Sequence, residues 1–329
     1  MIVSGSHTPG IDAADFDLPP GTAIRYEQPT PALRRFFPSY VVLDSVSLDP
    51  AGRRQWMLPA WGQIWIVLTE GQISVGIGNR RYERLGSAVL YGVTSRAMPI
   101  TSHGGVTIAI DVGPLGWARL FGPTADKLGD RLTPLDELLP PGWVEDLIGV
   151  LHASDRCFEV KAVLDGFLAA RLPPPHAQEA MVERIMTLLA DPHLTNLSEA
   201  AARIGIDNRT LCRLTKRFFG FPPKLLMMRY RFLRAFFDMY LDGERADGDG
   251  HPATYFDASH FNRDAQRFLG MTPKRFAKLE VPYLRAALRA RRLVCGSPTP
   301  ALDTVIPPAG EVRHRDAAEG EGIAFARVA

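Results

Sequence analysis

FDASHFNRDAQRFLGMTPKRF (residues 256–276) is a rewritten copy of IDNRTLCRLTKRFFGFPPKLL, which begins at Ile206. At a constant offset of fifty positions the two stretches share the following residues: Asp207/Asp257, Arg213/Arg263, Arg217/Arg267, Phe218/Phe268, Gly220/Gly270, Pro223/Pro273 and Lys224/Lys274. Self-similarity at one offset usually means one supersecondary unit used twice, and two copies are too few for a solenoid. The pair is therefore expected to serve a partner with two sites.

The bulk composition is that of a globular protein. The chain has 329 residues, long enough for two domains, and is 46% apolar and 22% charged. It contains no long apolar run, and its first residues lack the basic start and apolar stretch of a signal peptide. We expect a cytoplasmic protein that has no membrane partner.

The basic charge is concentrated where the repeat lies. The whole chain carries a formal net charge of +2, whereas residues 197–279 hold 15 Lys and Arg against 9 Asp and Glu, a net of +6. The remainder of the chain therefore carries −4. The repeated region is the part suited to a polyanionic partner.

The N-terminal part has the pattern of short strands. Residues 1–35 are rich in Pro, Gly and Asp without periodicity and are expected to form a disordered leader. Within residues 36–172, apolar and polar residues alternate in stretches such as 73–77, with turn residues between the stretches. We expect a small antiparallel β barrel or sandwich with helices at its C-terminal end, acting as a sensor or oligomerisation domain.

The Pro-rich run at residues 172–175 cannot continue a helix and marks a boundary. Helical patterns follow over residues 176–282, so the chain as a whole is expected to be α+β. Residues 295–329 show no apolar stripe and are expected to form a disordered tail.

The first copy has the pattern of a helix-turn-helix unit. Asn196 can cap a short helix that ends at Gly205, and Asp207 can cap a second helix. The outer face of the second helix is polar and basic, and carries Arg209, Cys212, Arg213 and Lys216. Such a face suits the DNA major groove, because Arg forks match guanine edges.

The second copy repeats this helix with Asp257 as its cap and Ala258, Ser259, Asn262 and Arg263 outward. A basic amphipathic helix alone most often just exposes its charged face to solvent. The duplication instead favours a protein that contacts DNA through two recognition helices, here called the two readers. The pattern of residues 227–241 predicts one long helix, which would fix the distance between the two recognition helices. Gly248, Gly250 and Pro252 lie where the first helix of the second unit belongs, and predict that this helix is short or distorted.

Residues 181–279 resemble the AraC/XylS family of bacterial transcription regulators. The most specific motifs are Leu211-Cys212-Arg213 with Phe218-Phe219-Gly220, and Ser259-His260-Phe261-Asn262-Arg263 with Arg267-Phe268-Leu269-Gly270-Met271-Thr272-Pro273. The resemblance implies two helix-turn-helix units joined by a long helix. It places base contacts on Arg209, Cys212, Arg213, Ala258, Ser259, Asn262 and Arg263. Phosphate contacts are expected at Lys216, Arg217, Lys224 and Arg267.

The resemblance implies double-stranded DNA as the partner, and leaves RNA polymerase, a small-molecule effector and a second copy of the chain as further partners. The activator role common in the family and a repressor role both stay open. No cofactor and no metal are expected. In the β-rich part, a ligand pocket could be lined by Trp56, Trp61, Trp65, Tyr82 and Tyr91, although such residues are more often plain core.

Two alternatives stay open. The helical part could be a scaffold that binds a protein partner, or DNA without specificity. The chain could instead be an enzyme with its active site in the β-rich part, but no Ser or Cys nucleophile motif and no metal-ligand cluster is present in the sequence. We therefore expect a protein that is not an enzyme.

Overall fold

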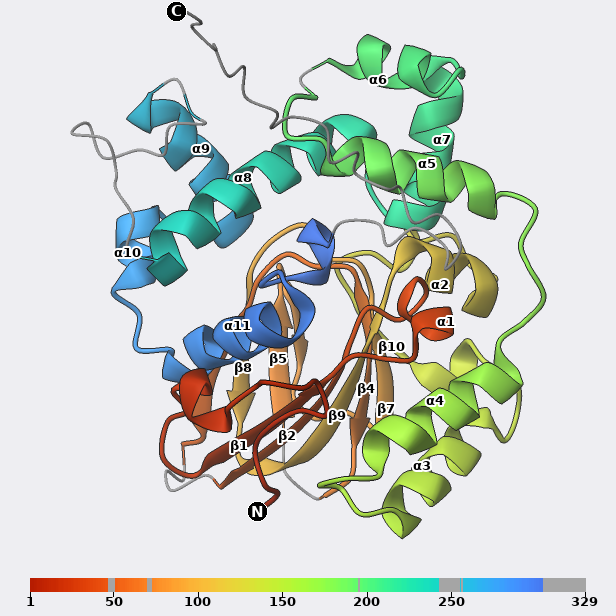
Figure 1. Ribbon diagram of the computed structural model, residues 1–329. Coiled ribbons are helices and arrows are strands. Elements are labelled where there is room, and N and C mark those ends of the chain that lie inside the picture. Colours follow the sequence, from red (N-terminus) through yellow and green to blue (C-terminus); the bar gives the residue numbers. More distant parts are fainter. Residues whose placement is uncertain (47–50, 70–72, 195, 243–254, 256, 304–329) are drawn as a thin grey trace, which may run out of the picture.

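The computed structural model of the protein describes residues 1–46, 51–69, 73–194, 196–242, 255 and 257–303. Two antiparallel sheets pack together, and a set of helices arches over one end of them (Figure 1). This arrangement confirms the predicted α+β class, with a β-rich N-terminal part and an all-helical part after it.

The described strands form two sheets. The larger has the order β1-β2-β9-β4-β7-β10, and the smaller has the order β3-β8-β5-β6. The strands are β1 (Thr22–Glu27), β2 (Tyr40–Val46), β3 (Arg53–Met57), β4 (Gly62–Val67), β5 (Ile73–Ile77), β6 (Arg80–Tyr82), β7 (Ala88–Tyr91), β8 (Met98–Ser102), β9 (Gly104–Val112) and β10 (Leu132–Pro134). Apolar residues alternate along β5, where Ile73, Val75 and Ile77 are buried, because successive side chains of a strand point to opposite faces.

Most helices follow the last strand, whereas η1 and α1 lie near the N-terminus and α2 lies between β9 and β10. They are η1 (Ala13–Phe16), α1 (Pro31–Arg34), α2 (Pro114–Leu120), η2 (Leu135–Glu137), α3 (Trp143–Ala153), α4 (Val160–Arg171), α5 (Glu179–Ala190), α6 (Leu197–Arg203), α7 (Asn208–Phe219), α8 (Pro223–Asp242), α9 (Ala258–Leu269), α10 (Pro273–Ala277), α11 (Pro282–Cys295) and η3 (Pro300–Leu302). The Pro-rich run at residues 172–175 lies between α4 and α5.

The prediction of a disordered leader over residues 1–35 is wrong. Strand β1 pairs with β2 along its whole length, from Thr22 opposite Ser45 to Glu27 opposite Tyr40. Gly5 adds a backbone bridge, since its N–H donates to the carbonyl of Ile24 (3.0 Å). The order comes from pairing with residues far along the chain, which leaves no local periodicity to recognise.

The C-terminal boundaries also differ from the prediction. Helix α11 begins at the predicted end of the helical part and returns to the two packed sheets, which are called the barrel below. There Ala290 and Val294 pack with Phe16 and Ile24. The predicted disordered tail begins with ordered residues, because Asp303 forms a bidentate pair with buried Arg291 (2.7 and 3.0 Å). Residues 304–329 lie outside the described part of the chain.

One apolar core runs from the sheets into the helical part. It includes Ile64 and Ile108 of the larger sheet together with Phe219 of α7 and Phe232 of α8, all of them fully buried. The β-rich and helical parts therefore support one another through shared packing rather than through a flexible linker.

Gly92, directly after β7, gives a test of this packing. A Cβ atom at this position would lie 1.6 Å from the carbonyl oxygen of Leu128, a backbone atom. We expect Gly92→Ala to lower the free energy of unfolding by about 1–3 kcal/mol or more, as overpacking does. Urea titration of the purified variant measures the change.

Gly166→Ala in α4 is the matched control for Gly92→Ala. Its Cβ would meet nothing within 4 Å, and a helical alanine is favoured over glycine by about 0.5–1 kcal/mol. The control should therefore be slightly more stable than the parent. Equal stability of the two variants would contradict the close approach of Gly92 to the backbone of Leu128.

Candidate nucleic-acid interface

Helices α6 and α7 form the first helix-turn-helix unit. The Asn196 side chain caps α6 by accepting from the N–H of Ser198 (2.8 Å), and Gly205 in the turn has φ 68°. The Asp207 side chain caps α7 by accepting from the N–H of Thr210 (2.7 Å). Ala200 and Ala201 of α6 are buried, and their small size lets the two helices pack closely.

Helix α7 separates its residues into two faces as predicted. Leu211, Leu214 and Phe218 are buried. The residues predicted to contact DNA lie on the other face, where Arg209, Arg213 and Lys216 are exposed and Cys212 and Arg217 are half-buried. Lys224 is exposed in the first turn of α8.

Helix α9 repeats the geometry of α7 fifty positions later. Asp257 caps it by accepting from the N–H of His260 (2.6 Å), and Gly270 ends it with φ 74°, as Gly220 ends α7 with φ 80°. Ser259, Asn262, Arg263 and Arg267 are exposed, and Ala258 is half-buried. The expected first helix of this unit falls on residues 243–254, outside the described part.

The cations at the centre of both faces have no protein partner. Among the described residues, Arg209, Arg213 and Arg263 form no ion pair and no side-chain hydrogen bond, whereas Arg231 and Arg291 are both paired with carboxylates. The free guanidinium groups keep all their donors for an external acceptor. Bidentate contacts to guanine or to phosphate use such donors.

Two residues of this region, Lys274 and Asp264, are not among the predicted site residues. Lys274 is exposed on α10, at the position equivalent to Lys224, so the offset of fifty could have identified it as a phosphate contact. Asp264 is a buried residue of α9 that accepts hydrogen bonds from Arg231 of α8 (2.8 Å) and from the Tyr255 hydroxyl (2.9 Å). This pair fixes α9 against the long helix.

The barrel holds the C-terminal ends of both recognition helices. The last carbonyl groups of a helix lack intrahelical partners. At the end of α7 the N–H of Ala125 donates to the carbonyl of Arg217 (2.7 Å), and at the end of α9 the N–H of Ala97 donates to that of Phe268 (2.7 Å). These contacts involve the C-terminal ends of the two helices and not their N-terminal ends.

Arg229 attaches the middle of α8 to the barrel. It is 1% exposed, and its Nη1 donates to the carbonyl of Thr94 (3.0 Å) and, over a longer distance, to that of Ala60 (3.4 Å). Its guanidinium lies 4.6 Å from the centre of the Trp61 ring. Burial lowers the pKa of Arg229 to about 10, so the side chain stays charged at neutral pH.

The residues predicted to line one aromatic pocket fall in two places, with Trp61 apart from the other four. Trp56 and Trp65 line a cavity between the two sheets, whereas Trp61 is buried at the contact with the helical part. The Tyr91 ring is packed at 4.5 Å from the Trp65 ring, and the Tyr82 hydroxyl accepts from the N–H of Leu132 (3.2 Å).

The described residues include no group of three or more His, Cys, Asp or Glu side chains placed to hold a metal ion. None of the helices in this part of the chain combines the length and the apolar character that crossing a membrane requires.

Comparison with solved structures finds matches at low sequence identity and with TM-scores below 0.5. A structure of ToxT from Vibrio cholerae has a TM-score of 0.42 and 11% identity, covering 74% of this chain and 98% of that chain. ToxT from strain SCE256 with a bound unsaturated fatty acid has a TM-score of 0.40 and 11% identity, covering 72% and 93%. The AraC-like transcriptional activator CuxR has a TM-score of 0.27 and 12% identity, covering 61% and 77%.

No protein-family model and no curated protein matches the chain. AraC-like regulators are among the solved structures to which the chain is similar.

Proposed function

We propose that the protein is a sequence-specific DNA-binding regulator of transcription of the AraC/XylS type. The observation that carries the proposal is the duplicated recognition helix. Both copies are capped by Asp, both end at a left-handed Gly, and both expose an unpaired Arg at the same position, Arg213 and Arg263. Helix-turn-helix proteins insert such a helix into the major groove.

The two readers act on one duplex as a single rigid unit. Helix α8 connects them, Arg229 fixes α8 to the barrel, and Asp264 fixes α9 to α8. Successive faces of B-DNA recur about every 34 Å, so a rigid two-headed monomer suits two neighbouring major-groove segments. Phosphate contacts are proposed at exposed Lys216, Lys224, Arg267 and Lys274 and at half-buried Arg217.

Replacing Arg213 with alanine tests the proposal. We expect Arg213→Ala to weaken binding to a selected duplex by about 1–3 kcal/mol, because a bidentate base contact is lost. Affinity for scrambled DNA should change little. Fluorescence anisotropy with both duplexes at one salt concentration measures the difference.

Arg81→Ala is the control for Arg213→Ala, since Arg81 is an exposed arginine on β6 of the barrel. It should leave both affinities unchanged. An equal loss on both duplexes in Arg213→Ala would assign Arg213 to phosphate instead of to a base.

Lys216→Ala should behave differently from Arg213→Ala. A phosphate contact releases counterions without reading sequence, so the loss should be uniform over duplexes. The slope of log K against log salt concentration should fall in magnitude by about 1. A loss confined to the selected duplex would contradict the phosphate assignment.

Cys212 gives a chemical test of the same face. Its thiol lies half-buried on α7 between Arg209 and Arg213, whereas burial raises the pKa of Cys295 to about 11 and makes that thiol less reactive. In a Cys157→Ser, Cys295→Ser background, selected duplex should protect Cys212 from N-ethylmaleimide, as measured by mass spectrometry. Equal labelling with and without the duplex would show that α7 does not enter the groove.

A further inference from the structure

A cavity of about 170 Å³ lies between the two sheets, and α11 forms part of its wall. Most of its wall is apolar, with contributions from Val41, Leu43, Ile73, Ile100, Leu284 and Leu288. The cavity exists because β9 presents small side chains, Thr107 and Ala109, on the face turned toward the smaller sheet. Larger residues at these positions would fill the space.

The size of the cavity limits its occupant. An engineered protein cavity of about 150 Å³ holds one benzene molecule. The present cavity is slightly larger, so it accommodates a single ring with a small substituent rather than a long acyl chain.

Gln55 is a residue of the cavity wall whose side-chain amide has no hydrogen-bond partner among the described residues. It lies on β3 opposite Ile100, lines the cavity and is 7% exposed. Neither its Nε2 nor its Oε1 has a hydrogen-bond partner among the described residues. A buried amide without partners is costly, and an occupant that both accepts and donates a hydrogen bond would satisfy it.

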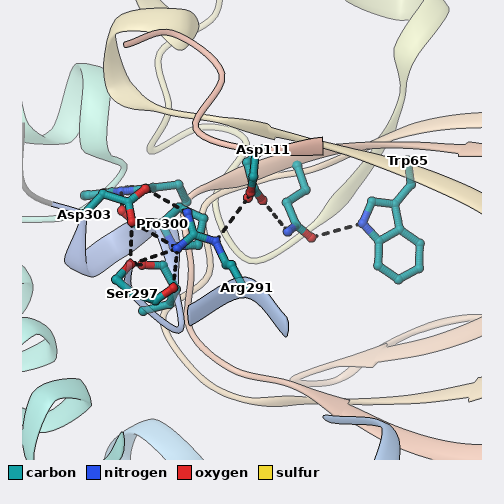
Figure 2. Close-up of polar contacts among 10 residues, drawn as sticks. Trp65, Asp111, Arg291, Ser297, Pro300 and Asp303 are labelled. Atoms are coloured by element: carbon teal, nitrogen blue, oxygen red, sulfur yellow. Dashed lines mark hydrogen bonds and ion pairs between the residues drawn. The ribbon is translucent and has the colours of Figure 1, made fainter. Parts of the chain in front are cut away.

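Four other polar residues of the wall, Gln63, Trp65, Asp111 and Arg291, contact one another or the segment after α11. Figure 2 shows contacts that run from Trp65 through Asp111 to Arg291. Trp65 Nε1 donates to Gln63 Oε1 (3.0 Å), and Gln63 Nε2 donates to Asp111 Oδ1 (2.5 Å). Arg291 Nε lies 3.7 Å from Asp111 Oδ2, and the rest of its guanidinium is held by Ser297 and Asp303.

The cavity disfavours a negatively charged occupant. Burial raises the pKa of Asp111 and of Tyr26, both in its wall, because the site stabilises an anion less well than water does. Arg291 is engaged by two carboxylates, and the half-exposed Arg53 already donates to Thr22 (2.6 Å) and to the carbonyl of Pro20 (3.2 Å).

We propose that this cavity binds a small uncharged ring compound that carries a hydrogen-bond donor and acceptor side by side, as a primary amide does, and that Gln55 pairs with them. Helix α11 forms the wall that closes over the ligand through Tyr283, Leu284, Leu288 and Arg291. The ring packs on the apolar wall, which includes Trp65.

Benzamide is the probe for this proposal, with toluene as the analogue that lacks the polar pair and benzoate as the charged analogue. We expect the full-length protein to bind benzamide more tightly than toluene or benzoate in saturation-transfer NMR titrations. Gln55→Leu should weaken benzamide binding at least tenfold and leave toluene binding unweakened. Its unfolding temperature, measured alongside, should stay within a few degrees of the parent or rise.

Gln178→Leu is the matched control, because Gln178 precedes α5 away from the cavity and also has a buried amide oxygen without a partner. It should bind benzamide as the parent does. Absence of benzamide binding, equal benzamide affinity in folded Gln55→Leu, or tighter binding of benzoate than of benzamide would each overturn the proposal.

Hydrogen exchange tests the closing wall separately. Bound benzamide should slow amide exchange in residues 283–291 of α11 and leave α5 unchanged. Unchanged exchange in α11 under saturating benzamide would overturn its assignment as the wall that closes over the ligand.

Discussion

The buried indole of Trp61 joins the barrel to the helical part, and the arrangement of both readers depends on it. Its ring contacts Phe219 at the end of α7 (5.6 Å between ring centres) and Tyr230 in α8 (6.1 Å). Its N–H donates to the carbonyl of Pro300 (3.1 Å), in the segment that returns from α11. Helix α7, helix α8 and the segment at Pro300 thus all contact the side chain of Trp61, which is 4% exposed.

This contact holds α7 and α8 against the sheets, and α8 in turn contacts α9 through Arg231 and Asp264. The barrel supplies N–H groups to the last carbonyls of α7 and α9, and α8 is fixed between them by Arg229. Preorganisation of this kind reduces the entropy lost on binding. Helix α11 borders the cavity and is separated in sequence from the second recognition helix, α9, by the short helix α10. Under the proposed function, an occupant of the cavity would therefore act on a helix close to α9 in the chain.

The recognition helices could be predicted because their signals are local. Asp207 and Gly220 lie at the ends of the helix that they define, and the fifty-residue offset transfers both ends to α9. Strand β1 and the Arg291–Asp303 pair could not be predicted, because β1 is ordered by pairing with β2, and Arg291 is held in the fold by Asp111 of β9, far away in the sequence. The same holds for Trp61, whose aromatic character predicted a pocket but whose packing partners are set by the tertiary fold. Gln55 carries no sequence signal, since a missing partner is a property of the folded structure.

Under the proposed function, one chain contacts two neighbouring major-groove segments of a duplex. Selection of bound sequences from a random duplex pool, with the purified full-length protein at near-physiological salt, is the decisive measurement. We expect an enriched motif with two informative blocks whose centres lie about 10–10.5 base pairs apart. A single informative block would contradict the two-headed reader, and the absence of any enriched motif would contradict sequence-specific recognition by these helices.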